Sequence, residues 1–187
     1  MGSTAVKMFG LILLANAGAA LSVTAAEGLQ SDNVAQRQQG MKAMAAAAKT
    51  INAMFKGSSA YDSKAFKAAA ETIGSHSGEG LSSLFTGSVI APGSKASASI
   101  AAEREQFDKL AADLLIYASA LSAAADRNPN VLSPQMRMQG GDAMMGGPLA
   151  KKPQAARDVA SMPAEHAFHM LLQTCTSCHA KFRMKDE

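Results

Sequence analysis

The sequence predicts an all-α protein, an antiparallel up-and-down four-helix bundle. Of its 187 residues, 48% are hydrophobic but only 5% are aromatic, and alanine and methionine dominate the apolar content. These residues favour helices, whereas β-sandwiches and barrels need β-branched and aromatic side chains. No segment alternates apolar and polar residues with the period of two that is typical of a half-buried strand. The length suits one domain and is too short for two.

The first 26 residues have the three parts of a secretory signal peptide. Lys7 precedes an apolar stretch at 8–21, which ends in small residues. The stretch is too short to span a bilayer, and no stop-transfer pattern follows it. We therefore expect cleavage after Ala25 or Ala26, export to a bacterial periplasm and a folded domain at 27–187. A retained N-terminal anchor is the alternative.

Two helices are expected in the first half of this domain. The first runs from about Ser31 to Phe55, because apolar residues recur there with the spacing of an a/d seam. The seam consists of Val34, Met41, Ala48 and Phe55, with Arg37, Met44 and Ile51 between them. The second helix is capped by Asp62 or Ser63 and reaches about Ser77. Its apolar stripe consists of Phe66, Ala69, Ala70 and Ile73.

The third helix follows a Gly- and Ser-rich loop at 78–97 that contains Pro92-Gly93. It has the clearest pattern in the chain and stops near Asp126, before Asn128-Pro129. Its seam consists of Ile100, Phe107, Leu114 and Leu121, with Glu103, Leu110, Tyr117 and Ala124 between them. Four amphipathic helices of such length, counting one at the C-terminus, form a bundle.

A long loop at 127–153 separates the third helix from the fourth. Connections of this length are commonly functional or disordered, although Ser133-Pro134 can start a short helical turn. Its methionines could bind Cu(I) through their thioethers, but such segments are more often adaptable apolar loops. The fourth helix begins between Pro153 and Pro163 and continues to the C-terminus. Its stripe consists of Phe168, Leu171, Leu172, Cys175, His179 and Phe182.

The only two cysteines of the chain lie in the last helix, in Cys175-Thr176-Ser177-Cys178-His179. Cys-x-x-Cys-His is the attachment sequence for c-type haem. Cysteines three residues apart on a helix point in neighbouring directions, so both thiols can reach the vinyl groups on one porphyrin edge. His179 can then bind the iron from one face. The sequence therefore predicts one covalent haem c on a C-terminal haem-attachment helix.

Other uses of Cys175 and Cys178 fit the chain less well. A dithiol redox motif is expected in a βαβ unit, and a structural zinc needs a fourth ligand beyond this cluster. A disulfide between adjacent turns is chemically possible in an exported chain but would close a very small loop and stabilise little. Export favours haem, because c-type haem is attached outside the cytoplasm.

Four pieces of sequence carry a resemblance to a known family. They are Arg-Gln-Gln-Gly-Met-Lys-Ala-Met at 37–44, Tyr61-Asp62, Leu84-Phe85 and the C-terminal stretch 175–183. With the haem motif near the C-terminus, where most c-type cytochromes do not have it, this pattern resembles the cytochrome c′ family of four-helix bundles. The resemblance covers the whole domain except 127–153, which is longer than we expect for the family.

The resemblance implies which residues surround the haem. In such bundles, the residue four positions after the arginine of the first helix lies over the open haem face, which makes Met41 a second axial ligand to the iron. Arg37 would share its face and reach a propionate. A thioether is a soft ligand that suits haem iron. Met44, Phe182 and Arg183 would complete the haem environment. By periodicity alone, Met41 would be an ordinary core residue.

The resemblance also implies a function. A haem held by His179 and Met41 describes a low-spin electron carrier of the cytochrome c-556-like branch, with periplasmic redox proteins as partners and no enzymatic activity. Family members often pair, so a homodimer is expected. The alternative is a high-spin protein that binds NO or CO, which requires Met41 to leave the iron open. A third reading is a haem-bearing subunit that docks to an oxidoreductase through 127–153. Nucleic acid is not an expected partner, because no basic run reaches five residues.

Overall fold

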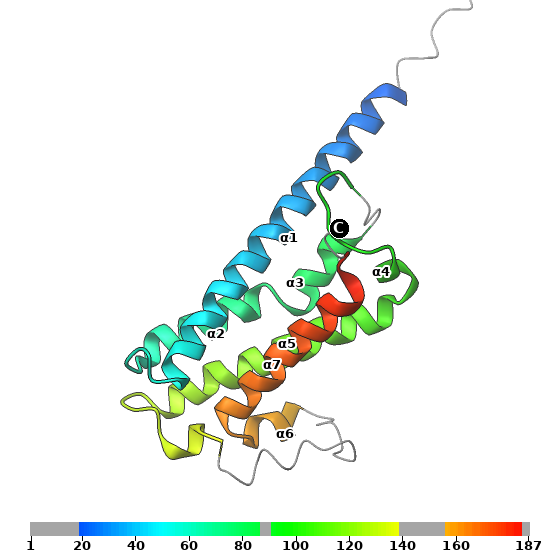
Figure 1. Cartoon of the computed structure of the whole chain (residues 1–187). Helices are drawn as coiled ribbons and strands as arrows, with labels where there is room; N and C mark the ends of the chain where they lie inside the picture. The colour runs from blue at the N-terminus through cyan, green and yellow to red at the C-terminus, as the bar shows by residue number, and fades with distance from the viewer. Residues whose placement is uncertain (1–18, 87–90, 139–155, 185–187) are drawn as a thin grey trace, which may run out of the picture.

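Four long helices form the body of the protein. The computed structural model describes residues 19–86, 91–138 and 156–184, and within these ranges it contains helices and no sheet (Figure 1). The long helices are α1 (Ala19–Phe55), α2 (Ser63–Ser75), α5 (Arg104–Arg127) and α7 (Ala164–Phe182). The short ones are α3 (Gly78–Ser82), η1 (Ser83–Phe85), α4 (Ser99–Ala102), η2 (Pro134–Met136) and α6 (Ala156–Ser161). The all-α bundle prediction is confirmed.

The first helix is longer than predicted but buries the predicted seam. It begins at Ala19 instead of near Ser31, so the expected cleavage region is helical, while residues 1–18 lie outside the described residues. Most seam positions are buried, and Met41 and Ala48 are half-buried. None of the helices described is both long and apolar enough to cross a membrane.

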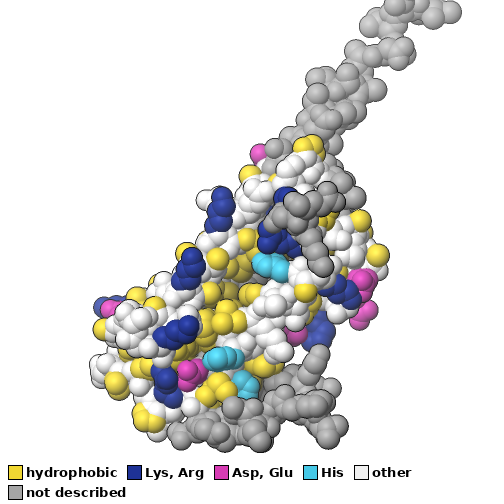
Figure 2. All heavy atoms as spheres, in the orientation of Figure 1, with side chains coloured by type: hydrophobic (Ala, Val, Ile, Leu, Met, Phe, Trp, Pro, Cys, Tyr) yellow, Lys and Arg dark blue, Asp and Glu magenta, His cyan; other side chains and the backbone are white. Residues whose placement is uncertain are grey.

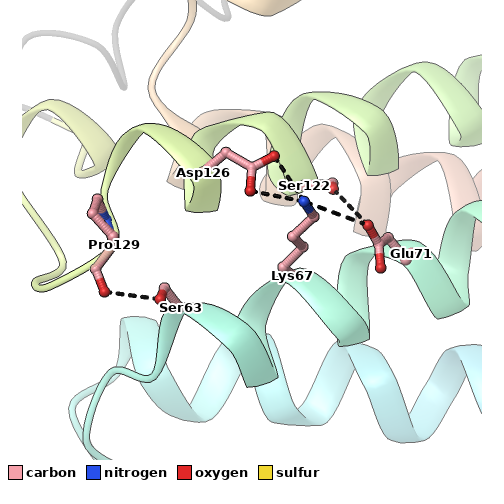
Figure 3. A network of polar contacts seen from close by, with 6 residues as sticks. All are labelled: Ser63, Lys67, Glu71, Ser122, Asp126 and Pro129. Atoms are coloured by element: carbon pink, nitrogen blue, oxygen red, sulfur yellow. Dashed lines mark hydrogen bonds and ion pairs between the residues drawn. The ribbon is translucent and has the colours of Figure 1, made fainter.

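The second helix matches the prediction closely. Asp62 is its N-cap, and the Asp62 carboxylate accepts a 2.8 Å hydrogen bond from the backbone N–H of Ala65. All four residues of the predicted stripe are buried. On the outer side, Lys67 lies 2.8 Å from the Asp126 carboxylate and connects α2 to α5 (Figure 3).

The connection between α2 and α5 is more ordered than expected. The predicted loop at 78–97 contains α3 and η1, and Ala96 forms an antiparallel bridge with Arg183. Gly78 has a φ of 58°, and a Cβ atom there would lie 2.9 Å from a methyl group of Leu115, so only glycine lets the chain turn here.

The third and fourth predicted helices are each interrupted. Glu103 leaves helical geometry (φ −125°, ψ 44°) and separates α4 from α5, so its predicted seam position is wrong: Glu103 is exposed and forms an ion pair with Lys181. Pro163 separates α6 from α7, since proline has no N–H to continue a helix. At the C-terminus, α7 ends at Phe182 because Arg183 adopts extended backbone.

Part of the predicted long loop is a cap on the bundle. Residues 128–138 are described and contain η2, as the Ser133-Pro134 signal indicates, whereas 139–155 lie outside the described residues. Met136 is only 1% exposed and packs in the main core, while Arg137 forms an ion pair with Glu165 at 3.2 Å. Because the Met136 thioether is buried in the main core, it is not available to bind Cu(I) together with other methionines at the surface of this segment.

The core has two clusters of buried side chains. The main cluster surrounds Phe55, whose ring centroid lies 5.5 Å from that of Phe66 and 5.7 Å from that of Phe168. Helix α1 packs mainly on α2, α2 on α5 and α5 on α7. The contact between Phe55 and Phe168 joins the first helix to the last. The second, smaller cluster includes Phe85, Phe107 and Phe182, and it lies at the opposite end of α7.

Candidate functional site

A pocket of about 370 Å³ opens between α1 and the C-terminal end of α7. On the face shown in Figure 2, hydrophobic side chains gather in a strip between these helices, with Lys and Arg on both sides. The lining residues from α1 are Val34, Arg37, Gln38, Met41 and Lys42. Those from α7 and the residue after it are Cys178, His179, Phe182 and Arg183. The pocket brings residues together that are far apart in the sequence.

Three aromatic rings in edge-to-face contact form the inner wall of the pocket. The ring centroid of Phe107 lies 4.8 Å from that of Phe85 and 5.4 Å from that of Phe182, both in edge-on geometry. Phe85 is held in place through Arg104, which donates hydrogen bonds to the carbonyls of Ser82 and Phe85 at 2.8 and 3.0 Å. The wall is therefore apolar and rigidly supported from α5.

The Cys-x-x-Cys-His residues lie in the last two turns of α7. Cys178 and His179 line the pocket, whereas Cys175 packs against the main core cluster. The two cysteines are half-buried and form no disulfide. Burial, together with the neighbouring Cys175, raises the pKa of Cys178 to about 11, so the thiol is protonated at neutral pH. His179 is exposed by its surface area, but partial desolvation and then Arg183 lower its pKa, which favours the neutral imidazole that can bind a metal.

Arg37 and Met41 come from the facing side of α1. Arg37 is only 7% exposed, and its guanidinium carbon lies 4.5 Å from the centre of the Phe85 ring. Burial lowers the pKa of Arg37, and among the described residues it has no ion pair. A buried cation of this kind calls for an anion in the pocket. Met41 is half-buried and lies one turn further along the same face.

Two predicted haem neighbours lie outside the pocket lining. Met44 is 8% exposed and belongs to the main core, with its sulfur 4.0 Å from the Ser77 hydroxyl at the end of α2. Cys175 is the other. Gly40 lets α1 lie close to the end of α2, because a Cβ atom at Gly40 would lie 3.1 Å from Nδ1 of His76.

One side of the pocket is formed by residues that the sequence did not single out. Ser94, Lys95 and Ala96 line it, and the Gln38 side chain donates a 2.9 Å hydrogen bond to the carbonyl of Gly93. The available signal was Pro92-Gly93, which indicated a turn but not what the turn packs against.

The residues of the pocket fit a c-type haem. The pocket combines an imidazole, a thioether and a thiol with an apolar aromatic wall, and Cys175 stands one turn before Cys178 on α7. Imidazole and thioether are ligands of haem iron, and Arg37 and Arg183 are suited to carboxylates. Within the described residues, no cluster of three or more His, Cys, Asp or Glu forms an alternative metal site.

Comparisons with known proteins agree with this interpretation. The family model described as Cytochrome C′ matches residues 32–142, a range that ends before the Cys-x-x-Cys-His motif. The fold is similar to cytochrome c′ from Rhodopseudomonas palustris (25% identity, TM-score 0.58), with 83% of this chain and 98% of that chain covered. It is also similar to cytochrome c′ from Thermochromatium tepidum (22%, 0.56), with 83% and 97% covered.

A third similar structure is a cytochrome c′ described as having a ligand-controlled dimer dissociation (19%, 0.56), with 83% of this chain and 97% of that chain covered. A search of curated protein sequences gives no significant match.

Proposed function

Because the chain belongs to the cytochrome c′ family of c-type haem proteins, we propose that it is a periplasmic electron carrier with one haem c, whose iron is held between His179 and Met41. Cys175 and Cys178 would attach the porphyrin covalently. The bound haem supplies a metal centre that gains and loses one electron.

The position of Met41 carries this proposal. Met41 lines the same pocket as His179, but from the opposite helix, so a planar group between α1 and α7 would have one of these side chains on each side. Met44, the other methionine of this part of α1, is turned toward Ser77 in the core. A soft thioether opposite an imidazole favours the reduced state and raises the reduction potential.

The other pocket residues have supporting roles in this proposal. Arg37 would bind a propionate, which supplies an anion to a buried guanidinium that has no ion pair with any described residue. Phe107 and Phe182 exclude water from the inner side of the pocket, and Arg183 lies at its rim. Both axial ligands stand on helices, so they move little when the charge on the centre changes.

The cellular setting is part of the same proposal. The signal-peptide pattern at 1–26 supports export, and a protein whose iron has both axial positions filled would exchange electrons with periplasmic redox proteins. The dimer described for one structure of similar fold supports a homodimer. We expect no catalytic activity.

The test is the absorption spectrum of the haem-loaded protein and of two methionine variants. The oxidised wild type should be low-spin and show the far-red charge-transfer band of a methionine–iron bond. Met41→Ala should become high-spin and bind CO readily when reduced. Met44→Ala is the control: it should keep the low-spin spectrum and lose about 2–5 kcal/mol of unfolding free energy.

Each other result has a definite meaning. A low-spin Met41→Ala together with a high-spin Met44→Ala would show that Met44 is the ligand. A high-spin wild type that binds CO stoichiometrically would reject the electron carrier in favour of a protein that binds NO or CO.

A further inference from the structure

A strap of residues 91–99 forms one side of the pocket, which Ser94, Lys95 and Ala96 line. It begins with a β-turn in which the Ser94 N–H donates a 2.9 Å hydrogen bond to the Ala91 carbonyl. Pro92 and Gly93 occupy the two central positions, and Gly93 has a φ of 76°, as the third residue of a type II turn requires. Apart from its two chain neighbours, no described residue has an atom within 4 Å of where a Gly93 Cβ atom would be, so it is the backbone conformation that favours glycine here.

The far part of the strap is bound to the end of α7. The Ser97 N–H donates to the Phe182 carbonyl at 2.9 Å, and the Met184 N–H donates to the Lys95 carbonyl at 2.8 Å. The Ser99 hydroxyl adds a 3.2 Å hydrogen bond to the Lys181 carbonyl. In Figure 1 the strap, in green, passes beside the red end of α7. The strap therefore moves with the turn that carries His179.

The near part of the strap is bound to α1 through Gln38. The Gln38 side chain donates its 2.9 Å hydrogen bond to the carbonyl that the Gly93 conformation presents. Gln38 and Met41 are three residues apart on α1 and both line the pocket, so they share a face. At this end of the bundle, α1 and α7 are separated by the pocket, whereas at the other end Phe55 and Phe168 touch. The strap thus bridges the open end.

We propose that Gln38 is a positioning residue for Met41: through its hydrogen bond to the strap, it holds the Met41 face of α1 at a set separation from the end of α7. This inference rests on the proposed function, in which Met41 and His179 bind one iron from opposite sides. The strap then resists separation of the two helices. Loss of the Gln38 bond would loosen both the strap and the Met41 face of α1, so the Met41 thioether would be held less firmly toward a haem in the pocket.

The experiment compares Gln38→Glu with Gln39→Glu in the haem-loaded protein near neutral pH. The two substitutions change the charge equally at adjacent exposed positions of α1. Only Gln38→Glu affects the strap, because it replaces the amide that donates to the Gly93 carbonyl. The carboxylate that takes its place cannot donate a hydrogen bond to a carbonyl. Two quantities are measured: the rate at which imidazole displaces methionine from the oxidised iron, and hydrogen exchange of the Ser97 and Met184 amides.

Gln38→Glu should raise both quantities by about 2- to 10-fold, the range that one net hydrogen bond accounts for, while Gln39→Glu leaves both unchanged. Gly93→Ala removes the same bond from the other side by disfavouring the turn. If both variants act on one bond, the double variant Gln38→Glu/Gly93→Ala should change the displacement rate by less than the product of the single effects.

Two results would overturn the inference. Equal behaviour of Gln38→Glu and Gln39→Glu would show that the hydrogen bond does not hold the strap. Faster amide exchange with an unchanged displacement rate would show that the strap is structural and does not position Met41. A wild type without a methionine–iron band rejects the proposed function itself, and is recognised from the spectrum before any variant is made.

Discussion

Replacing Phe107 by leucine tests whether the small aromatic cluster supports the pocket, and Phe168→Leu provides a matched control. Both phenylalanines are 2% exposed, so the two substitutions remove the same group from equally buried positions. They differ in their partners. Phe107 contacts two rings and lines the pocket, whereas Phe168 contacts one ring, at 5.7 Å, and does not line the pocket.

The expected magnitude follows from these contacts. An aromatic pair contributes about 0.5–1.5 kcal/mol beyond the burial of its area, so Phe107→Leu should lose about 1–3 kcal/mol from its two pairs. Phe168→Leu should lose about 0.5–1.5 kcal/mol from its single pair. The lost burial is common to both variants and cancels in the comparison. A difference of 1 kcal/mol corresponds to about 2–4 °C in melting temperature for a protein of this size.

The assay combines unfolding in guanidinium chloride with absorption spectra of the haem-loaded variants. Phe107→Leu should have the lower midpoint and an altered haem spectrum, because its ring forms part of the pocket wall. Phe168→Leu should lower the midpoint less and keep the wild-type spectrum. If Phe168→Leu is the more destabilising variant, or changes the spectrum as much as Phe107→Leu does, the small aromatic cluster does not support the pocket.

Two further predictions concern residues outside the pocket. Met136→Ala should lower the unfolding free energy by about 2–5 kcal/mol, because Met136 is 1% exposed. The control Met184→Ala, at a 45% exposed site, should change the unfolding free energy by less than about 0.5 kcal/mol. Equal values for the two variants in denaturant unfolding would contradict the capping role of 128–138. A hydrogen bond from Ser82, and to a smaller extent the contact with Arg104, lower the pKa of Asp108. The Asp108 carboxylate therefore stabilises the fold above its unfolded pKa of about 4. This contribution to stability is lost as the pH falls through the lower pKa of the folded state. In acid titrations of unfolding, Asp108→Asn should show a shallower loss below about pH 4; an unchanged slope would rule out Asp108 as a contributor.

The long elements could be predicted because their signals are local. Asp62 caps α2 as expected, and the stripe beginning at Phe66 is buried because apolar residues at helical spacing must face the core. The seam of α1 follows the same rule from Val34 to Phe55. Interruptions were harder to predict: Glu103 has no local signal for a break, and its exposure is explained by an ion pair with Lys181 from a distant helix.

The candidate site divides in the same way. Cys175, Cys178 and His179 are contiguous, so their chemistry could be recognised without any structure. Gln38, Phe85 and Phe107 could not be assigned to the pocket, because each belongs to a different element and only packing brings them to one place. Met41 and Met44 share the seam of α1, and periodicity cannot separate them.

The sequence by itself determined the helical composition, the haem-attachment motif and the family, because each can be read from short stretches of the chain without knowing how those stretches pack. Only the tertiary structure decided that Met41 faces the pocket while Met44 faces Ser77, and that a strap connects α1 to α7. The physical reason is that side chains three residues apart on a helix point in directions that differ by about 60° around the helix axis. Whether each direction meets a pocket or a core depends on the neighbouring element. For Met44 that neighbour is Ser77, 33 positions away, whereas for Met41 it is the end of α7, more than a hundred positions away.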